Sequence, residues 1–352
     1  MDFSLFYFAN DSGNAEENRY RLLLDGARFA DEHGFHAVWT PERHFHNFGG
    51  TYPNPSVTSA AIAAVTSRVK IRAGSVVAPL HHPLRIAEEW SVVDNISNGR
   101  VGVSFASGWH ATDFALNPSA YADRRTEMYD RIEQVRTLWR GEPIEVTDGT
   151  GAPVKVRSFP PPVQEDLPVW VTSVGDVTTF RSAGRNRAGL LTHLLGQSPE
   201  ELAGKIAEYR KAASEATNGA WNGHVVVMVH TFLGEDDETV REIVRPSLMD
   251  YMRSSLRLIL SSDVSTDPAD PDSLDQDEVD FLVERAFDHY FDNVGLLGSV
   301  DKAAGVAANL AELGVDEIAC LIDFGLPTDE VLGGLTHLNR LRDVCQERNA
   351  AS

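Results

Sequence analysis

The residues best suited to catalytic chemistry lie in the stretch 42–46, ERHFH, just after a short apolar run that ends at Trp39. A glutamate beside histidines can orient an imidazole for proton transfer, and histidine titrates near neutral pH. Arg43 keeps its proton, so it can orient an anion but cannot act as a base. The alternative is a loop in which Glu42 pairs with Arg43 and the histidines are solvated. The sequence has no His-Glu-x-x-His motif and no partners at ligand spacing, so we expect no metal site.

Small residues follow two further apolar runs. Gly74-Ser75 lies near the end of run 69–77, and the segment SGWH, residues 107–110, follows run 101–106. A glycine at a strand end lets a planar ligand approach the backbone closely. The alternatives are a β-bulge at the first position and a core tryptophan beside a turn at the second.

A third polar group precedes a predicted helix. Gly175 and Asp176 come just before the helical pattern that opens near Thr178. Free N–H groups at a helix N-terminus bind phosphate, and threonine hydroxyls add donors. Asp176 can instead be a helix N-cap, which needs no ligand, and its charge argues against a phosphate directly over its side chain.

Three reactive side chains lie in apolar runs. His193 lies near the end of the run 189–194, His230 lies within 224–233, and Cys320 lies within 317–324. A lone histidine on an apolar strand is more often a hydrogen-bonded core residue than a catalyst. Cys320 has no base nearby in the sequence to activate it, so it is predicted to be core.

The elements that would position these residues alternate between strand and helix. Near-continuous apolar runs are typical of parallel strands that are buried on both faces. The pattern therefore predicts a (β/α)8 TIM barrel, with its chemistry at the C-terminal ends of the strands. A doubly wound sheet is the alternative, but the fingerprint Gly-x-Gly-x-x-Gly is missing after the first strand. The predicted strands are 3–8, 35–39, 69–77, 101–106, 168–173, 189–194, 224–233 and 317–324, and the main helices are 16–33, 56–67, 84–96, 121–140, 178–183, 199–216, 236–260, 279–291, 299–313 and 329–348.

The chain of 352 residues is expected to form a single barrel domain, 1–352, with two insertions. The segment 141–167 is polar, rich in glycine and ends in a proline run, which suits an excursion such as a small hairpin. The segment 261–278 is acidic and contains prolines, so it is predicted to be a mobile loop or lid.

Charge and composition exclude several classes of function. The formal net charge of -21 disfavours nucleic acid and anionic membranes as partners, because phosphate contacts need clustered Lys and Arg. Two cysteines make no disulfide framework, which indicates a reducing cytoplasm. The N-terminus lacks a basic segment, and no apolar run approaches the roughly 20 residues of a membrane span, so neither a signal peptide nor a span is expected.

Longer motifs resemble those of the bacterial luciferase-like flavin-dependent monooxygenases. They are VWTPERHF, NPSVTSAAIAAVTSRVKIRAGSVV, HPLRIAEEWSVVDNISNGRVGVSFASGW and GVDEIACLIDFG, and together they cover nearly the whole chain. The runs LLTHLLGQ and VMVHTFLG are similar to the subgroup found in natural-product biosynthesis.

This resemblance implies a (β/α)8 barrel that binds reduced FMN at its C-terminal face. In the family, reduced flavin reacts with O2 to give a C4a-hydroperoxide, which transfers one oxygen atom. A separate flavin reductase supplies the reduced flavin, and a homodimer is usual. The substrate implied is a secondary metabolite, free or tethered to a carrier protein. An F420-dependent dehydrogenase and a non-catalytic subunit are the alternatives on the same fold.

The resemblance also assigns candidate site residues. Ser107 stands where luciferase has an arginine that reaches the phosphate, so that contact is lost or replaced here. Arg43 stands where luciferase has the first of two adjacent histidines, and His44 matches the second. The candidates for catalysis are His44, Arg43, His110 and His230. The candidates for cofactor binding are Gly74 and Ser75, which in the family often form a cis peptide under the ring, with Ser107, Trp109, Arg125, Ser173, Gly175, Thr179 and Thr192.

Overall fold

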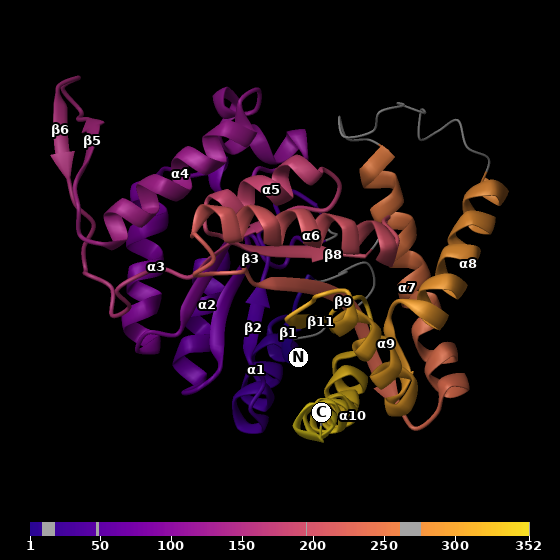
Figure 1. Cartoon of the computed structure of the whole chain (residues 1–352). Coiled ribbons are helices and arrows are strands. Elements are labelled where there is room, and N and C mark those ends of the chain that lie inside the picture. The colour runs from indigo at the N-terminus through magenta and orange to yellow at the C-terminus, as the bar shows by residue number, and fades with distance from the viewer. Residues whose placement is uncertain (9–17, 47–48, 195, 261–275, 352) are drawn as a thin grey trace.

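The computed structural model describes residues 1–8, 18–46, 49–194, 196–260 and 276–351, and these form a barrel surrounded by helices (Figure 1). The ring of hydrogen-bonded strands runs β9-β11-β1-β2-β3-β4-β7-β8 and closes through the β8–β9 pair. Each of these pairs is parallel, as the sequence predicts for a (β/α)8 barrel. The strands are β1 (Asp2–Phe6), β2 (Ala37–Thr40), β3 (Lys70–Val77), β4 (Val101–Ala106), β7 (Val169–Thr172), β8 (Gly189–His193), β9 (Val225–Gly234) and β11 (Glu317–Leu321).

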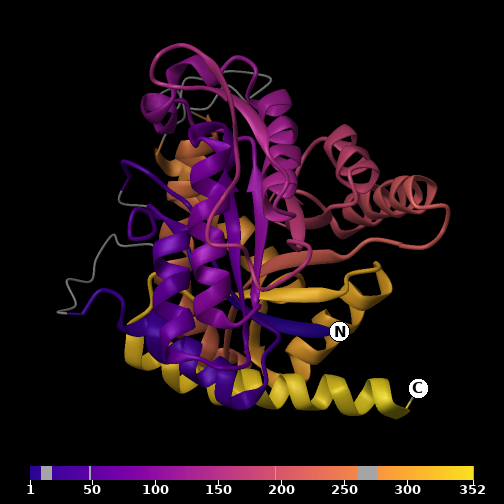
Figure 2. The same cartoon turned by 90° about the vertical axis from the view of Figure 1, so that its left-hand side faces the viewer.

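Helices cover the outside of this ring, and most follow the strand that precedes them in the chain (Figures 1 and 2). None of the helices in the described ranges is long and apolar enough to cross a bilayer. The helices are α1 (Arg21–His33), α2 (Pro55–Val65), α3 (Pro83–Ser97), α4 (Arg124–Trp139), α5 (Val177–Arg185), α6 (Pro199–Ala216), α7 (Asp237–Leu260), α8 (Gln276–Asn293), α9 (Val300–Glu312) and α10 (Thr328–Ala351), with 3-10 turns at Ala78–Leu80, Ala111–Leu116 and Pro118–Ala120.

Local sequence signals set the helix ends that the sequence predicted. Ser198 accepts the N–H of Glu201 and the Glu201 carboxylate accepts the N–H of Ser198, so the capping box at the start of α6 is confirmed. Gly34 ends α1 in the left-handed region, with φ of 74°.

One strand of the barrel sheet escaped the sequence prediction. β10 (Leu296–Ser299) is short, contains a glycine and leads directly into α9, so its sequence resembles the loop before a helix. It pairs with the segment 231–234 at the end of β9, beyond the part of β9 that pairs with β11. β10 therefore extends the sheet beside the closed ring.

The two predicted insertions have different outcomes. The segment 141–167 contains an antiparallel hairpin, β5 (Ile144–Thr147) and β6 (Pro153–Val156), which projects away from the barrel (Figure 1). The loop predicted over 261–278 lies for the most part outside the described residues, and α8 already begins at Gln276 within it.

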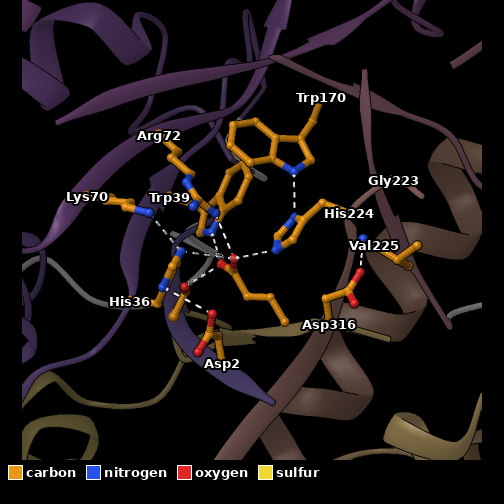
Figure 3. Close-up of polar contacts among 12 residues, drawn as sticks. Asp2, His36, Trp39, Lys70, Arg72, Trp170, Gly223, His224, Val225 and Asp316 are labelled. Atoms are coloured by element: carbon orange, nitrogen blue, oxygen red, sulfur yellow. Dashed lines mark hydrogen bonds and ion pairs between the residues drawn. The ribbon is translucent and has the colours of Figure 1, made fainter. Parts of the chain in front are cut away.

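A buried polar cluster fills the N-terminal end of the barrel (Figure 3). Glu317 of β11 is fully buried and accepts hydrogen bonds from Arg72 Nη1 at 2.7 Å, from Trp39 Nε1 at 3.1 Å and from the Ser4 hydroxyl. The Arg72 guanidinium lies between aromatic rings, 4.8 Å from Trp39 and 4.3 Å from Trp170. We call these residues the Glu317 cluster. It connects β1, β2, β3, β7 and β11 at the end of the barrel opposite the C-terminal ends of the strands, which we call the mouth.

Candidate functional site

The candidate residues of the sequence gather at the C-terminal ends of the strands. Segment 42–46 follows β2, the cis-linked pair Gly74-Ser75 lies within β3, and segment 107–110 follows β4. Residues 173–179 follow β7, and His230 lies on β9. All of them belong to one end of the ring, so the barrel brings together residues that are far apart in the chain.

Glu42 is the centre of the hydrogen bonding after β2. It is 4% exposed, and its carboxylate accepts from His44 Nε2 at 2.8 Å, His81 Nε2 at 2.5 Å and the Val77 N–H at 2.7 Å. Burial opposes its ionisation, but the hydrogen bonds from the two histidines and Val77 outweigh it and lower the pKa of Glu42. We call Glu42, His44 and His81 the Glu42 cluster. Sequence analysis did not find His81 as a partner, because 39 positions separate it from Glu42.

The Glu42 cluster fixes the proton positions on His44. A carboxylate only accepts, so His44 donates through Nε2–H, and Nδ1 of the neutral ring then carries a free lone pair. Burial lowers the pKa of His81, but its hydrogen bond to Glu42 more than compensates and leaves the pKa raised. His81 therefore carries the positive charge that balances Glu42 more readily than an ordinary histidine would.

Arg43 does not pair with Glu42, contrary to the alternative considered for this loop. Its side chain is buried, and Nη1 lies 3.9 Å from the Asp113 carboxylate. The guanidinium stands 5.0 Å from the centre of the Trp109 ring and 5.9 Å from that of Phe8. Its Nε and Nη2 atoms are buried without a hydrogen-bond partner.

His110 belongs to a second group of donors beside Arg43. His46 Nε2 lies 3.2 Å from His110 Nδ1, which is 3.7 Å from Asp113 Oδ1. Burial and the neighbouring His46 lower the pKa of His110. Both this group and the Glu42 cluster hold three metal-ligating atoms within 4.8 Å of one another. The absence of a metal, expected from the sequence, stays a prediction.

The segment around Gly74 lies beside the end of β2, where Thr40 pairs with Ala73. The peptide bond Gly74-Ser75 is cis, as the family resemblance implied, and β3 has a bulge here. The Ser75 hydroxyl is hydrogen-bonded to Thr172 Oγ1, which lies 2.7 Å from Ser104 Oγ. Three hydroxyls thus link β3, β4 and β7 under the mouth.

Replacing Gly74 by alanine is expected to destabilise the protein by about 1–3 kcal/mol, because an added methyl group overpacks a full core. A Cβ at Gly74 would lie 2.6 Å from the Phe6 ring and 3.2 Å from that of Trp39. Thermal unfolding measures the loss. Gly204→Ala is the matched control, since a Cβ there meets nothing within 4 Å. Equal melting temperatures for the two variants would contradict the prediction.

The turn after β7 carries the predicted phosphate residues. Asp176 is the N-cap of α5 and accepts the Thr178 N–H at 2.8 Å. Gly175 is exposed, with open space where a Cβ would point. Arg125 is exposed on α4, and its positive charge helps to lower the pKa of Asp176, after the hydrogen bond from Thr178. Ser173 and Thr179 flank this turn and are half-buried.

Lys205 is a second cation beside this turn, and no sequence pattern indicated it. It lies inside α6, and its Nζ donates to the Val174 carbonyl at 3.1 Å and to Gln197 Oε1 at 2.9 Å. Gln197 Nε2 in turn lies 3.3 Å from Thr192 Oγ1, which is buried on β8. Thr192 is therefore linked to the turn, although it does not form part of its surface.

His230 is buried as the core interpretation predicted, yet one of its ring nitrogens is unpartnered. Tyr290 Oη accepts the His230 backbone N–H at 3.2 Å and lies 3.0 Å from Nδ1. Tyrosine has one proton to donate, so Nδ1 accepts it and Nε2 carries the ring proton. Nε2 is buried without a partner, and burial followed by the nearby His193 lowers the pKa of His230 to about 3. His230 is a neutral donor at physiological pH and a poor base.

A cavity of about 520 Å³ lies elsewhere on the molecule. Its lining includes Leu167, just before β7, and Arg187, just before β8, so it opens at the N-terminal end of the strands. None of the candidate residues of the sequence lines it.

Comparison with protein families gives a match over residues 1–317 to the model described as luciferase-like monooxygenase. Among curated proteins, the chain is similar to the oxygenase component of a flavin-dependent trigonelline monooxygenase from Acinetobacter baylyi. The two are 28% identical over 246 residues, which is 68% of this chain and 66% of that protein. The match thus spans slightly less than two thirds of that relative.

Among solved structures, the monooxygenase RslO1 from Streptomyces bottropensis superposes with a TM-score of 0.79 at 25% identity, covering 97% of this chain and 98% of that one. The oxygenating constituent of 3,6-diketocamphane monooxygenase from Pseudomonas putida, in complex with FMN, has a TM-score of 0.74, 17% identity and 96% coverage of both chains. An F420-dependent secondary alcohol dehydrogenase has a TM-score of 0.70 at 16% identity, covering 95% of this chain and 96% of that one. The last two likenesses show the shared fold.

Proposed function

The chain belongs to the luciferase-like monooxygenase family, and from this premise we propose that it is the oxygenase component of a two-component system. In this proposal it uses reduced FMN and O2 to transfer one oxygen atom to an organic substrate. The observation that carries the proposal is the Glu42 cluster, which orients His44 and fixes which of its ring nitrogens donates, at the C-terminal ends of the strands.

The residues at the mouth fit a flavin. Arg125 and Lys205 offer positive charge near the turn before α5, where a phosphate is favoured by the helix N-terminus. His230 Nε2 is a buried donor without a partner, as expected of a group that faces a polar ligand. Reduced FMN, when bound, would supply the electrons that activate O2.

The chain's own residues would then control protons, orientation and water. Glu42 holds the Nε2–H of His44, so His44 Nδ1 can accept a proton from a reacting group and return it. The His230 Nε2–H can donate to an oxygen atom without changing charge. The Trp109 and Phe8 rings lie beside the Arg43 guanidinium and would keep water from it.

Turnover with chemically reduced FMN and 18O2 tests the proposal, with long-chain aldehydes, cyclic ketones and aromatic acids as probes. One 18O atom in a product supports it. Reoxidation of the flavin without an oxygenated product for any probe contradicts it. The F420-dependent alternative predicts instead that reduced F420 binds tightly and exchanges hydride without O2 consumption, and the same assay with F420 measures this.

Replacing Arg125 by methionine is expected to weaken FMN binding by about 5-fold, the effect of losing one exposed charge pair with a phosphate. Riboflavin lacks the phosphate, so its affinity should not change. Flavin fluorescence titration measures both ligands, and Arg140→Met, an exposed arginine near the other end of the barrel, is the control. Equal loss of FMN and riboflavin affinity would place the phosphate elsewhere.

The finer features of the proposal follow the same family. A separate flavin reductase would deliver reduced FMN, because the sequence has no dinucleotide fingerprint. We also propose a secondary metabolite, free or bound to a carrier protein, as substrate, and a homodimer of single-domain chains in the cytoplasm. Analytical ultracentrifugation of the purified chain tests the dimer.

A further inference from the structure

We infer that Arg43 binds a carboxylate of the substrate, so that the enzyme selects carboxylate-bearing, planar compounds. This inference rests on the proposed function and deepens it by naming a substrate class. It starts from the incomplete environment of Arg43, which is a buried cation with unused donors.

The unused donors of Arg43 form one face of its guanidinium group. Nη1 points toward Asp113, at 3.9 Å, which is longer than a hydrogen bond. Nε and Nη2 are buried and have no partner. These two nitrogens direct parallel N–H bonds from the same edge of the group, which is the fork that a carboxylate accepts with both oxygens.

The surroundings of Arg43 select a planar partner. The guanidinium lies 5.0 Å from the centre of the Trp109 ring and 5.9 Å from that of Phe8, so aromatic surface flanks it. Asp113 is buried and supplies only part of the balancing charge, and its Oδ1 also lacks a hydrogen-bond partner. A planar ligand can stack on the aromatic surface while its carboxylate meets the fork.

The position of Arg43 separates this anion from the flavin phosphate. Arg43 follows β2, whereas Arg125, Lys205 and the turn before α5 surround the ends of β7 and β8. In the ring of strands, β8 stands opposite β2. A phosphate at the turn therefore leaves the Arg43 fork open for a second anion, and the substrate is the remaining ligand.

Binding of 4-fluorobenzoate and 4-fluorobenzamide to the flavin-free protein, followed by 19F NMR, tests the inference. We expect the wild type to bind the acid about 10-fold or more tightly than the amide, because a bidentate charge-assisted pair is lost with the amide. In Arg43→Met, the affinity for the acid should fall to that for the amide. In Arg43→Lys, the affinity for the acid should lie between those of the wild type and Arg43→Met, since lysine keeps the charge but not the fork. Arg28→Met, an exposed arginine on α1, is the control with the same charge change.

A second variant, which is expected to bind the acid more tightly, tests the inference even if the Arg43 variants do not fold. Asp113→Asn removes the competing carboxylate and should tighten binding of the acid by about 3-fold or more. Equal affinity of the wild type for acid and amide, or no effect of Asp113→Asn, would overturn the inference. Because no flavin is present, these results are independent of oxygen transfer. Acid selectivity without 18O incorporation would reject the oxygenase proposal and keep the carboxylate site.

Discussion

Replacing Glu317 by alanine is expected to lower the free energy of unfolding by about 3–5 kcal/mol, since it leaves the buried Arg72 without its counter-ion. Arg72 Nη1 donates to Glu317 at 2.7 Å inside the barrel, and Trp39 Nε1 and the Ser4 hydroxyl lose their acceptor too. A fall of roughly 4–7 °C in the melting temperature follows for a chain of this size. Differential scanning calorimetry measures it.

The double variant Arg72→Met, Glu317→Leu distinguishes a charge effect from a packing effect. Replacing both members of a buried pair by apolar residues of similar volume often costs little. We therefore expect the double variant to recover most of the stability that Glu317→Ala loses. Glu284→Ala, which removes an exposed partner of Arg245, is the control and should change stability little. A double variant as unstable as Glu317→Ala would contradict this account.

The Glu317 cluster also predicts how stability depends on pH. Burial opposes ionisation of Glu317, but Arg72 and then His36 and His224 outweigh it and lower its pKa to about 2. An unfolded glutamate titrates near pH 4.3, so the stabilising contribution of Glu317 is complete above that pH and is lost as the pH falls toward 2. Between pH 2 and 5, the melting temperature of the wild type should therefore fall more steeply with decreasing pH than that of Glu317→Gln. Parallel curves would exclude this role for Glu317.

The barrel was predictable from the sequence because each strand buries both faces. Apolar runs such as 101–106 therefore stand out without any knowledge of the partners, and β4 (Val101–Ala106) matches its prediction. β10 was not predicted because a strand of four residues that includes a glycine is too short to show a hydrophobic pattern. The Glu317 cluster was missed because Arg72 and Glu317 are 245 positions apart, although a charge within an apolar run is itself a signal.

The site was predictable in its residue types but not in its pairings. The stretch 42–46 indicated a polar cluster. Whether Glu42 pairs with Arg43 or with the histidines depends on β3, because this strand brings Val77 and His81 beside Glu42. Lys205 had no signal at all, because a lysine inside a helix is usually solvated. Local sequence identifies the strand ends, while the closure of the ring decides which of them meet.

Replacing Glu42 by glutamine is expected to lower kcat/KM by about 100-fold or more, as for the loss of an oriented proton-transfer group. The carboxylate accepts from His44, His81 and the Val77 N–H, whereas an amide offers one oxygen and turns an N–H₂ donor toward one of these donors. Where the N–H₂ takes the place of Oε1, which His44 and His81 share, His44 must rotate or move its proton to Nδ1, and the lone pair that accepts a proton disappears. The measurement is kcat/KM between pH 5 and 9 with any substrate that incorporates 18O.

The pH profile separates this role of Glu42 from a purely structural one. Its ion pair with His81 stabilises the fold above the ordinary pKa of a glutamate and weakens as the pH rises through the raised pKa of His81. In Glu42→Gln the pKa of His81 should fall, which NMR titration of the imidazole detects directly. Glu330→Gln, an exposed glutamate in the first turn of α10, is the control and should leave both measurements unchanged. Wild-type kcat/KM in a folded Glu42→Gln protein would show that His44 does not depend on Glu42, and proton transfer would then have to be assigned to another group at the mouth.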